Sequence, residues 1–168
     1  MRPGLLPIIL AKPTLTARQA IDRLGLATSL QVCLDAGDPA SYPTGAGQSW
    51  LDRSGNGYDF FLGVDAAATA TDPTFNGSVG RLRPSAYWSF DAGDYFTYDT
   101  TNETWMESLH QDAAVFSMVC WVYFGAVGAV QGIFGTAGTT GTGTGIGCWL
   151  SSGNALTVDV RNAGVGVT

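Results

Sequence analysis

The alternation of hydrophobic and polar positions predicts that most of this chain forms short β-strands. Beyond residue 30, apolar runs of strand length alternate with clusters of Gly, Asp, Asn and Thr. This is the pattern of strands joined by turns. The predicted strands lie at 31–35, 58–63, 86–91, 94–98, 114–124, 130–135, 145–151 and 155–160.

The run AVFSMVCWVYF at 114–124 is mainly apolar on both faces of a strand, because odd and even positions are both hydrophobic. A strand with two apolar faces is typical of the middle of a sandwich. We therefore predict that 114–124 is a central strand. We also expect Trp88, Phe90 and Trp121 to lie in the core, since sandwich cores contain many aromatic residues.

Helical signals are confined to two short stretches. Thr16 and Gln19 have the spacing of a capping box, and Gly25 is a suitable stop, so we expect a helix at 16–24. The apolar face of this helix consists of Ala17, Ala20, Ile21 and Leu24. The second stretch is 101–111, with Asn102 as the expected cap. Residues 1–13 contain three prolines and are expected to be extended.

Charge divides the chain into a basic N-terminal segment and an acidic body. Residues 1–30 contain four basic residues and one acid, a net charge of +3, whereas residues 31–168 contain four basic residues and thirteen acids, a net charge of −9. We interpret 1–30 as a docking segment and 31–168 as the folded body. The residues expected to dock are Arg2, Lys12, Arg18, Ile21 and Leu24.

The same charges argue against two classes of partner. An acidic body repels a phosphate backbone, so nucleic-acid binding is not expected. The apolar run from Leu5 to Leu10 is short and interrupted by Pro7, so membrane insertion is not expected either. Cys33, Cys120 and Cys148 each lie in an apolar run and are expected to be buried free thiols, as in a reducing cytoplasm.

Several motifs in order resemble a known superfamily. They are LDAGDPASYP, W-x-D-x-SGNG, PTFNG, SFDAGDYF, FSMVCWVYF and GIGCWLSSGNALTV. The chain resembles the concanavalin A-like lectin/glucanase superfamily in its laminin G-like branch, which is common in phage and bacterial surface proteins. The resemblance covers about 31–160 and implies an all-β fold, an antiparallel β-sandwich of the jelly-roll type. Only RNAGVGVT follows the last predicted strand region, so the sandwich is expected to be incomplete in this chain.

The segment from 34 to 60 has two interpretations. In one, Asn56-Gly57 forms a tight turn, Asp52 caps backbone amides and Trp50 packs at the edge of the core. In the other, the oxygens of Asp and Asn bind a hard cation. Some members of the superfamily hold a structural calcium near such loops. The residues for that site here would be Asp52, Asn56, Asp91 and Asp94.

Catalysis is not expected. Glucanases of the superfamily carry an E-x-D-x-x-E strand, which is missing here. The only glutamates, Glu103 and Glu107, are four residues apart on a predicted helix, whereas a glycosidase needs carboxylates on opposite sides of the sugar. Exposed aromatic residues offer a sugar-stacking surface instead, and the candidates are Tyr87, Tyr95 and Tyr98.

Taken together, these patterns favour a non-enzymatic structural or adhesion protein of a virion, in a phage tail, fibre or head decoration, assembled in the host cytoplasm. Its expected partners are other virion proteins, bound through residues 1–30, host-surface glycan and further copies of itself in a homo-oligomer. No cofactor is expected beyond the calcium considered above. The alternative is a carbohydrate-binding module of a soluble or cell-surface protein.

Overall fold

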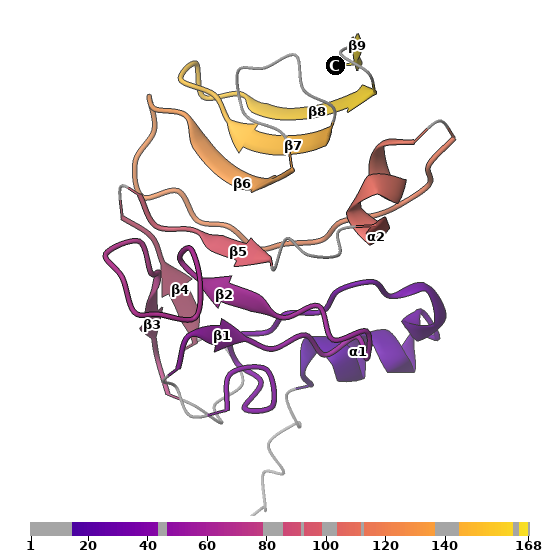
Figure 1. The fold of residues 1–168 in the computed structure, drawn as a ribbon, viewed down its shortest axis with the longest axis vertical. Coiled ribbons are helices and arrows are strands. Elements are labelled where there is room, and N and C mark those ends of the chain that lie inside the picture. The colour runs from indigo at the N-terminus through magenta and orange to yellow at the C-terminus, as the bar shows by residue number, and fades with distance from the viewer. Residues whose placement is uncertain are drawn as a thin grey trace, which may run out of the picture. The chain divides into compact units, whose positions relative to one another are not determined.

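A computed structural model describes residues 15–43, 47–78, 86–91, 93–98, 104–111, 113–136, 145–162 and 165–167. The chain divides into two compact units, Met1–Thr100 and Thr101–Thr168, here called the N-terminal and C-terminal units. Short antiparallel strands form most of the regular structure of both units (Figure 1). The β-rich, antiparallel character predicted from the sequence is therefore confirmed.

The N-terminal unit begins with the predicted helix, α1 (Ala17–Arg23). Thr16 accepts a hydrogen bond from the amide of Gln19, and the Gln19 side chain accepts one from the amide of Thr16. This reciprocal pair satisfies two amides that a helix start leaves unbonded. Gly25 has a φ of +71° directly after the helix, a conformation that glycine adopts without steric cost. A single 3-10 turn, η1 (Ala27–Ser29), follows.

Two small sheets follow in the N-terminal unit. The first has the order β1-β2-β5, and the second pairs β3 with β4. All the pairings are antiparallel. The bounds of these strands are β1 Ser49–Trp50, β2 Phe60–Leu62, β3 Thr74–Asn76, β4 Tyr87–Ser89 and β5 Phe96–Tyr98. β2, β4 and β5 lie inside predicted strands, whereas β1 and β3 were not predicted because two or three residues carry too little alternation.

A cluster of aromatic rings joins the two sheets of the N-terminal unit. The ring of Trp88 on β4 lies 5.6 Å from that of Trp50 on β1 and 5.2 Å from that of Phe96 on β5. It also lies 5.2 Å from the ring of Phe75 on β3 and 4.8 Å from that of Tyr42. Tilted and edge-to-face contacts at these separations are favourable aromatic geometries. The expectation that Trp88 lies in the core is confirmed.

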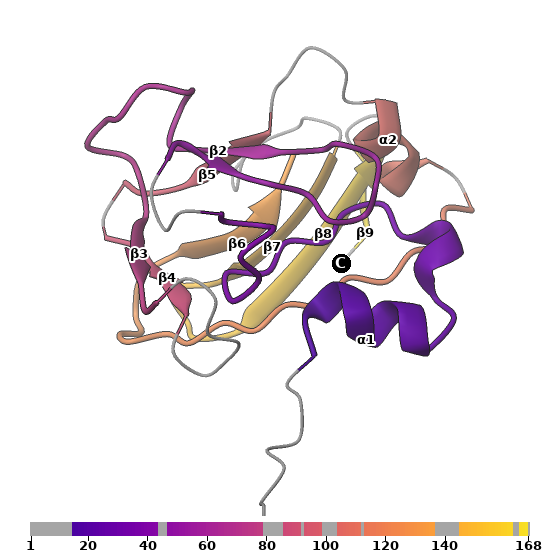
Figure 2. The ribbon, with the colours of Figure 1, turned by 90° about the horizontal axis from the view of Figure 1, so that it is seen from below.

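The C-terminal unit contains a short helix and one four-stranded sheet. The helical turns are α2 (Thr104–Glu107) and η3 (Ser108–His110), within the predicted stretch; Asn102, its expected cap, lies outside the described residues. The sheet has the order β6-β7-β8-β9, and Figure 2 shows β6, β7 and β8 side by side. The strands are β6 Gln131–Gly135, β7 Gly145–Leu150, β8 Leu156–Asn162 and β9 Val165–Val167. β7 supplies the most buried side chains, among them Ile146, which is 1% exposed.

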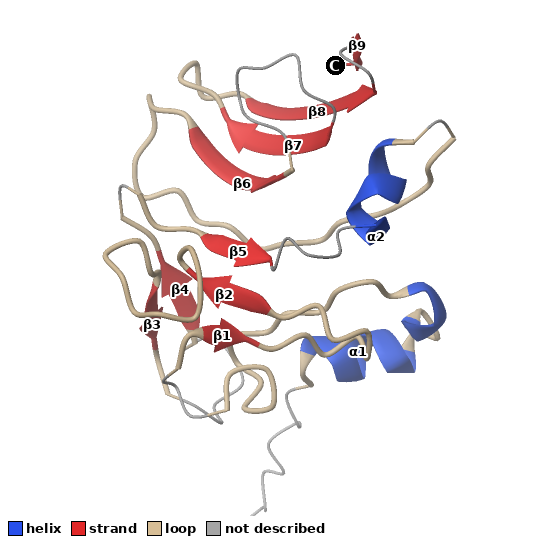
Figure 3. Ribbon diagram, in the orientation of Figure 1, coloured by secondary structure: helices blue, strands red, loops and turns tan. Residues whose placement is uncertain are grey.

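The prediction of a central strand at 114–124 is wrong. The chain between η3 and β6 forms neither helix nor strand at these residues (Figure 3). Trp121 is 73% exposed and Phe90 is 54% exposed, so neither lies in the core. A hydrophobic pattern shows that a segment can be buried on two faces, but a strand also needs a neighbouring strand to bond with.

The prediction of a strand at 31–35 is also wrong, and its backbone bonds show why. The carbonyl of Cys33 accepts from the amide of Arg53 at 2.8 Å, and the amide of Cys33 donates to the Asp52 carboxylate at 2.8 Å. The amide of Asp35 donates to the hydroxyl of Ser41 at 3.2 Å. Two of these three bonds therefore go to side chains, which compete with a strand ladder for the backbone groups.

Candidate functional site

Asp52 organises the turn that carries the W-x-D-x-SGNG motif. Its Oδ1 accepts from the amides of Cys33 and Ser54, both at 2.8 Å. Its Oδ2 accepts from the hydroxyl of Ser54 and, at 3.3 Å, from the amide of Tyr58. The residue is 8% exposed. A carboxylate has about four lone-pair sites, so these four donors fill its acceptor capacity.

The rest of this turn is also held by internal bonds. The side-chain amide of Asn56 donates to the carbonyls of Leu30 and Gln31 at 3.0 and 2.9 Å. Gly57 has a φ of +76°, as the tight-turn interpretation requires. These bonds engage the oxygens of Asp52 and the side-chain N–H group of Asn56 within the turn. Their bonds support the structural interpretation, in which Asp52 caps amides and Trp50 packs into the aromatic cluster.

The other two calcium candidates, Asp91 and Asp94, form a pair between β4 and β5. The amide of Asp91 donates to Oδ2 of Asp94 at 2.9 Å. The negative charge of Asp94, and a side-chain hydrogen bond that the protonated Asp91 carboxyl donates to it, raise the pKa of Asp91 above its usual range. Among the residues that the structure describes, no three His, Cys, Asp or Glu side chains gather as a metal site would require.

Two exposed aromatic residues, Phe90 and Tyr95, flank the acid pair. Together, Phe90, Asp91, Asp94 and Tyr95 are called the β4–β5 turn. Phe90 is 54% and Tyr95 41% exposed. The turn is attached to the body at Tyr95, whose carbonyl accepts from the amide of Gly63 at 2.9 Å and whose amide donates to the carbonyl of Thr71 at 3.2 Å.

Gly63 holds this attachment because no other residue fits its position. It has a φ of +70°, which favours glycine. A β-carbon there would also collide with the side chain of Asp72 and lie 2.9 Å from the hydroxyl of Thr71. The Asp72 carboxylate in turn bonds the amide and hydroxyl of Thr69. This network fixes the backbone of the β4–β5 turn at Tyr95 while its side chains stay open to solvent.

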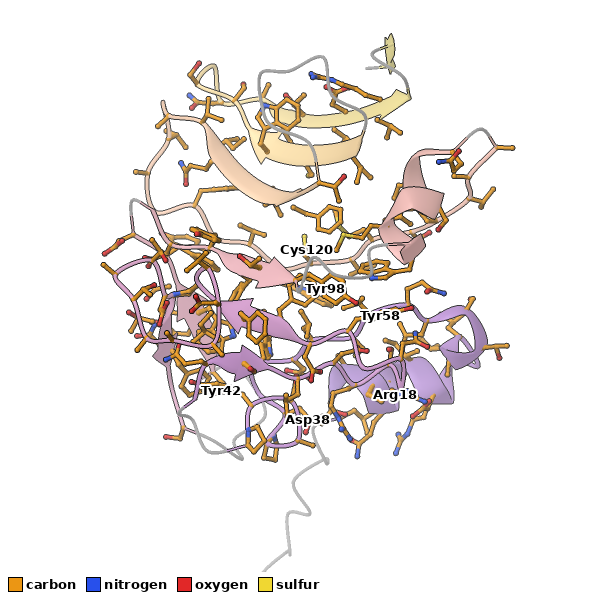
Figure 4. The ribbon with its side chains drawn as sticks, in the orientation of Figure 1. Arg18, Asp38, Tyr42, Tyr58, Tyr98 and Cys120 are labelled. Carbon is orange, nitrogen blue, oxygen red and sulfur yellow. The ribbon has the colours of Figure 1, made fainter. Side chains whose placement is uncertain are left out.

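The three tyrosines proposed to bind sugar are in different environments. Tyr87 is 55% exposed, because its neighbour Trp88 points into the aromatic cluster and side chains alternate along a strand. Tyr95 is open for the same reason, since Phe96 points inward. Tyr98 instead packs edge-on against Tyr58, with ring centroids 5.7 Å apart (Figure 4). Tyr87 and Tyr95 thus remain available for stacking, whereas Tyr98 is occupied by its neighbours.

Phe90 is the exposed aromatic residue that sequence reasoning missed. Alternation placed it on the same face as Trp88, and that face was expected in the core. Phe90 directly follows the end of β4. Its ring contacts that of Phe96, with centroids 5.4 Å apart, but about half of its side chain stays exposed to solvent. No signal in the sequence marks that point, because it depends on where the β3–β4 pairing stops.

The docking residues proposed on the helix are partly used within the molecule. Nη1 of Arg18 donates to the carbonyls of Arg53 and Ser54 at 2.7 and 2.6 Å, and Figure 4 shows Arg18 on α1. The Asp35 carboxylate accepts from the amide of Ala17 at 2.8 Å. These bonds tie α1 to its own unit, so part of the hydrogen-bonding capacity of Arg18 is used within the molecule.

The remaining docking candidates differ in accessibility. Ile21 is half-buried, whereas Leu24 is 71% exposed at the end of the helix. Arg2 and Lys12 lie outside the described residues. On the described helix, Leu24 is therefore the candidate that a partner can reach.

The three cysteines are also in different environments. Cys33 and Cys148 are buried as expected, but Cys120 is exposed, because segment 114–124 is not covered by a sheet. Burial, and then the charges of Asp35 and Asp52, raise the pKa of the Cys33 thiol to about 11. Burial also raises the pKa of Cys148. Since the thiolate is the reactive form, burial and the raised pKa both protect Cys33 and Cys148, whereas Cys120 is accessible to reagents.

We expect iodoacetamide at pH 8 to alkylate Cys120 in the folded protein and to leave Cys33 unmodified until the protein unfolds. Peptide mass spectrometry measures this directly. The raised pKa also predicts a pH effect on stability. Above about pH 8.5 the unfolded chain loses the Cys33 proton while the folded chain keeps it, so the stabilising contribution falls as pH rises toward 11.

The variant Cys33→Ala is the control for the pH effect, because it lacks the titrating thiol. The difference in unfolding free energy between wild type and this variant should shrink or reverse between pH 8 and pH 10.5. A difference that stays constant over this range, or rapid alkylation of Cys33 in the folded protein, would contradict the assignment.

Comparisons with known proteins identify no relative of this chain. No family model matches the sequence, and searches of curated proteins and of solved structures find no significant match. In the described part of the chain, the helices are all too short or too polar to cross a membrane.

Proposed function

We propose that this chain is a non-enzymatic structural and adhesion protein of a virion, a phage tail, fibre or head-decoration component that binds host-surface glycan through its N-terminal unit. In this proposal the small sheets are part of a lectin-like, concanavalin A-type jelly-roll sandwich. The observation that carries the proposal is the exposure of Phe90 and Tyr95 beside the paired carboxyls of Asp91 and Asp94, with Tyr87 also exposed on β4.

The chemistry of this surface suits a saccharide. Sugar rings present apolar C–H faces that stack on aromatic rings, and hydroxyl groups that donate to carboxylates. Tyr95 and Phe90 supply exposed rings, and Asp91 and Asp94 supply exposed or half-exposed acceptors between them. The Gly63 and Thr71 bonds to the backbone of Tyr95 limit the ordering cost of binding, since less of the surface has to be fixed by the ligand.

The placement in a virion is supported by the sequence rather than by the glycan surface. A proline-rich basic segment precedes an acidic body, and the motifs resemble modules of phage surface proteins. The alternative, a free carbohydrate-binding module, has the same glycan surface. The two are separated by immunogold labelling of purified particles, which stains only a virion component.

We expect the full-length protein to bind at least one member of an array of bacterial surface polysaccharides and lipopolysaccharide fragments. With the soluble oligosaccharide of the best hit, Tyr87→Ala and Tyr95→Ala should each weaken binding about tenfold, which corresponds to about 1.4 kcal/mol. Titration followed by NMR or calorimetry measures the intrinsic affinity without avidity.

Tyr123→Ala is the matched control, because Tyr123 is 91% exposed but belongs to the C-terminal unit. Its affinity for the soluble oligosaccharide should equal that of the wild type. The proposal fails if no glycan on the array binds, or if Tyr123→Ala weakens binding as much as the two N-terminal variants.

A further inference from the structure

The C-terminal unit presents a long exposed apolar segment between η3 and β6. Of the seventeen large hydrophobic residues exposed in the described part of the chain, nine lie between residues 115 and 130. We call these nine the apolar strip: Val115, Phe116, Met118, Val119, Trp121, Val122, Tyr123, Val127 and Val130. Contiguous apolar surface on this scale marks an interaction site rather than ordinary surface variation.

Exposure along the strip alternates as it does on a strand with one open face. Val115, Val119 and Tyr123 are 98%, 75% and 91% exposed, whereas Phe116 and Met118 are 41% and 44% exposed. The odd-numbered side chains therefore form the open face, and the even-numbered ones are partly covered. Residues 115–124 nevertheless form no strand. An extended apolar segment of this kind is a template for pairing with another strand.

The distribution of charge along the chain indicates which partner binds the apolar strip. Residues 113–130 contain no Asp, Glu, Lys, Arg or His, in a chain whose net charge is −6. Two copies are repelled over the rest of their surface, but not here. A partner with charged groups at this surface would have to bury them without counter-charges, which is costly. The same strip on a second copy matches it in length, in apolar character and in the absence of charge.

The area approaches that of a standard interface. With about 150–250 Å² for each aromatic side chain and somewhat less for each aliphatic one, Val115, Val119, Trp121 and Tyr123 on the open face offer on the order of 600 Å² per copy. A standard interface buries about 800 Å² per partner. Trp121 and Tyr123, at 73% and 91% exposure, are of the residue types that contribute most to such interfaces.

We propose that the apolar strip is a homotypic interface, in which segments 115–123 of two copies pair antiparallel about a two-fold axis near Val119. Val119 is the midpoint between Val115 and Tyr123, the two most exposed residues of the strip. In this register Val119 faces Val119 of the second copy, and Val115 faces Tyr123. An isologous contact of this kind closes after two copies, so it gives a dimer rather than a filament.

The test measures the mass of the full-length protein by sedimentation velocity from low to high micromolar concentration. We expect a monomer–dimer equilibrium for the wild type. Val119→Lys and Val119→Glu should each be monomeric throughout, because each places two like charges at the axis. An equimolar mixture of these two variants should form a one-to-one heterodimer, since the charges then oppose each other across the axis.

Leu156→Lys is the matched control. Leu156 on β8 is 64% exposed in the same unit and outside the strip, so this variant should dimerise like the wild type. Because Val119 is exposed, its replacement should not disturb folding, so a monomeric Val119 variant is not explained by misfolding. Far-UV circular dichroism of the variants checks this point.

Three results would overturn the proposal. The first is a wild type that stays monomeric, which would mean that a different chain covers the apolar strip. The second is a Val119→Lys variant that dimerises, and the third is a mixture of Val119→Lys and Val119→Glu that forms no heterodimer. Open-ended aggregation of the wild type would overturn the two-fold register as well. The inference goes beyond the proposed glycan binding and fails separately from it, because a monomeric variant can still be titrated with soluble oligosaccharide.

Discussion

Replacement of Asp52 by Ala is expected to lower the free energy of unfolding of the N-terminal unit by about 3–5 kcal/mol. The carboxylate is 8% exposed and accepts from the amides of Cys33, Ser54 and Tyr58 and from the hydroxyl of Ser54. Removing it leaves several donors without an acceptor in a buried turn, and hydrogen bonds to a charged group contribute about 1.5–3 kcal/mol each before non-additivity. Urea unfolding followed by circular dichroism measures the loss.

Two further variants separate this role from a general effect of losing an aspartate. Asp65→Ala removes an exposed carboxylate that accepts from the amide of Ala67, at 2.8 Å, and should cost well under about 1 kcal/mol. Asp52→Asn should have a free energy of unfolding between those of the wild type and Asp52→Ala, because its amide keeps one acceptor oxygen but presents N–H groups to the remaining donors. Equal stability of Asp52→Ala and Asp65→Ala would show that the buried turn does not depend on this carboxylate.

Replacement of Trp88 by Ala is expected to cost about 3–5 kcal/mol, the range for removing a large aromatic residue from a core. Its ring contacts Tyr42, Trp50, Phe75 and Phe96, so one side chain links both sheets of the N-terminal unit. The cavity left behind would touch every strand of the cluster. Chemical unfolding monitored in the far ultraviolet reports the loss, and only the transition of the N-terminal unit should move.

Trp88→Phe tests whether the ring contacts or the buried indole N–H of Trp88 have the larger effect on the free energy of unfolding. Among the described residues, the buried Trp88 Nε1 has no hydrogen-bond partner, so the phenylalanine variant loses ring contacts but also removes an unsatisfied donor. We expect it to cost about 1–2 kcal/mol. Phe90→Ala, two residues along the chain and 54% exposed, is the control and should cost less than either. A Trp88→Ala variant as stable as Phe90→Ala would mean that the rings do not hold the two sheets together.

The two proposals concern different units and reinforce each other if both hold. Glycan binding depends on Tyr87 and the β4–β5 turn, whereas the apolar strip lies in the C-terminal unit. A dimer would carry two glycan-binding surfaces. On a repetitive cell surface, the second binding contact of the same dimer can raise the overall affinity by about 10²–10⁴. Weak single-site binding would then be compatible with firm attachment.

Much of the local structure of this chain was fixed by short-range signals in the sequence. The capping box at Thr16 and Gln19 placed α1, because both of its bonds lie within one helical turn. The tight turn at Asn56 and Gly57 was predicted from the backbone freedom of glycine. β7 and β8 were predicted nearly at their observed bounds, since each is an apolar-rich run of strand length bounded by turn residues.

Only the tertiary structure decided which apolar runs became strands and which side chains became buried. Segments 31–35 and 114–124 have strand-like composition, but a strand exists only where another segment bonds with it, and that partner is distant in sequence. For the same reason Trp88 lies in a cluster while Trp121 faces solvent. The amides that Asp52 accepts from could be identified only when Cys33, Ser54 and Tyr58 were brought around it by folding.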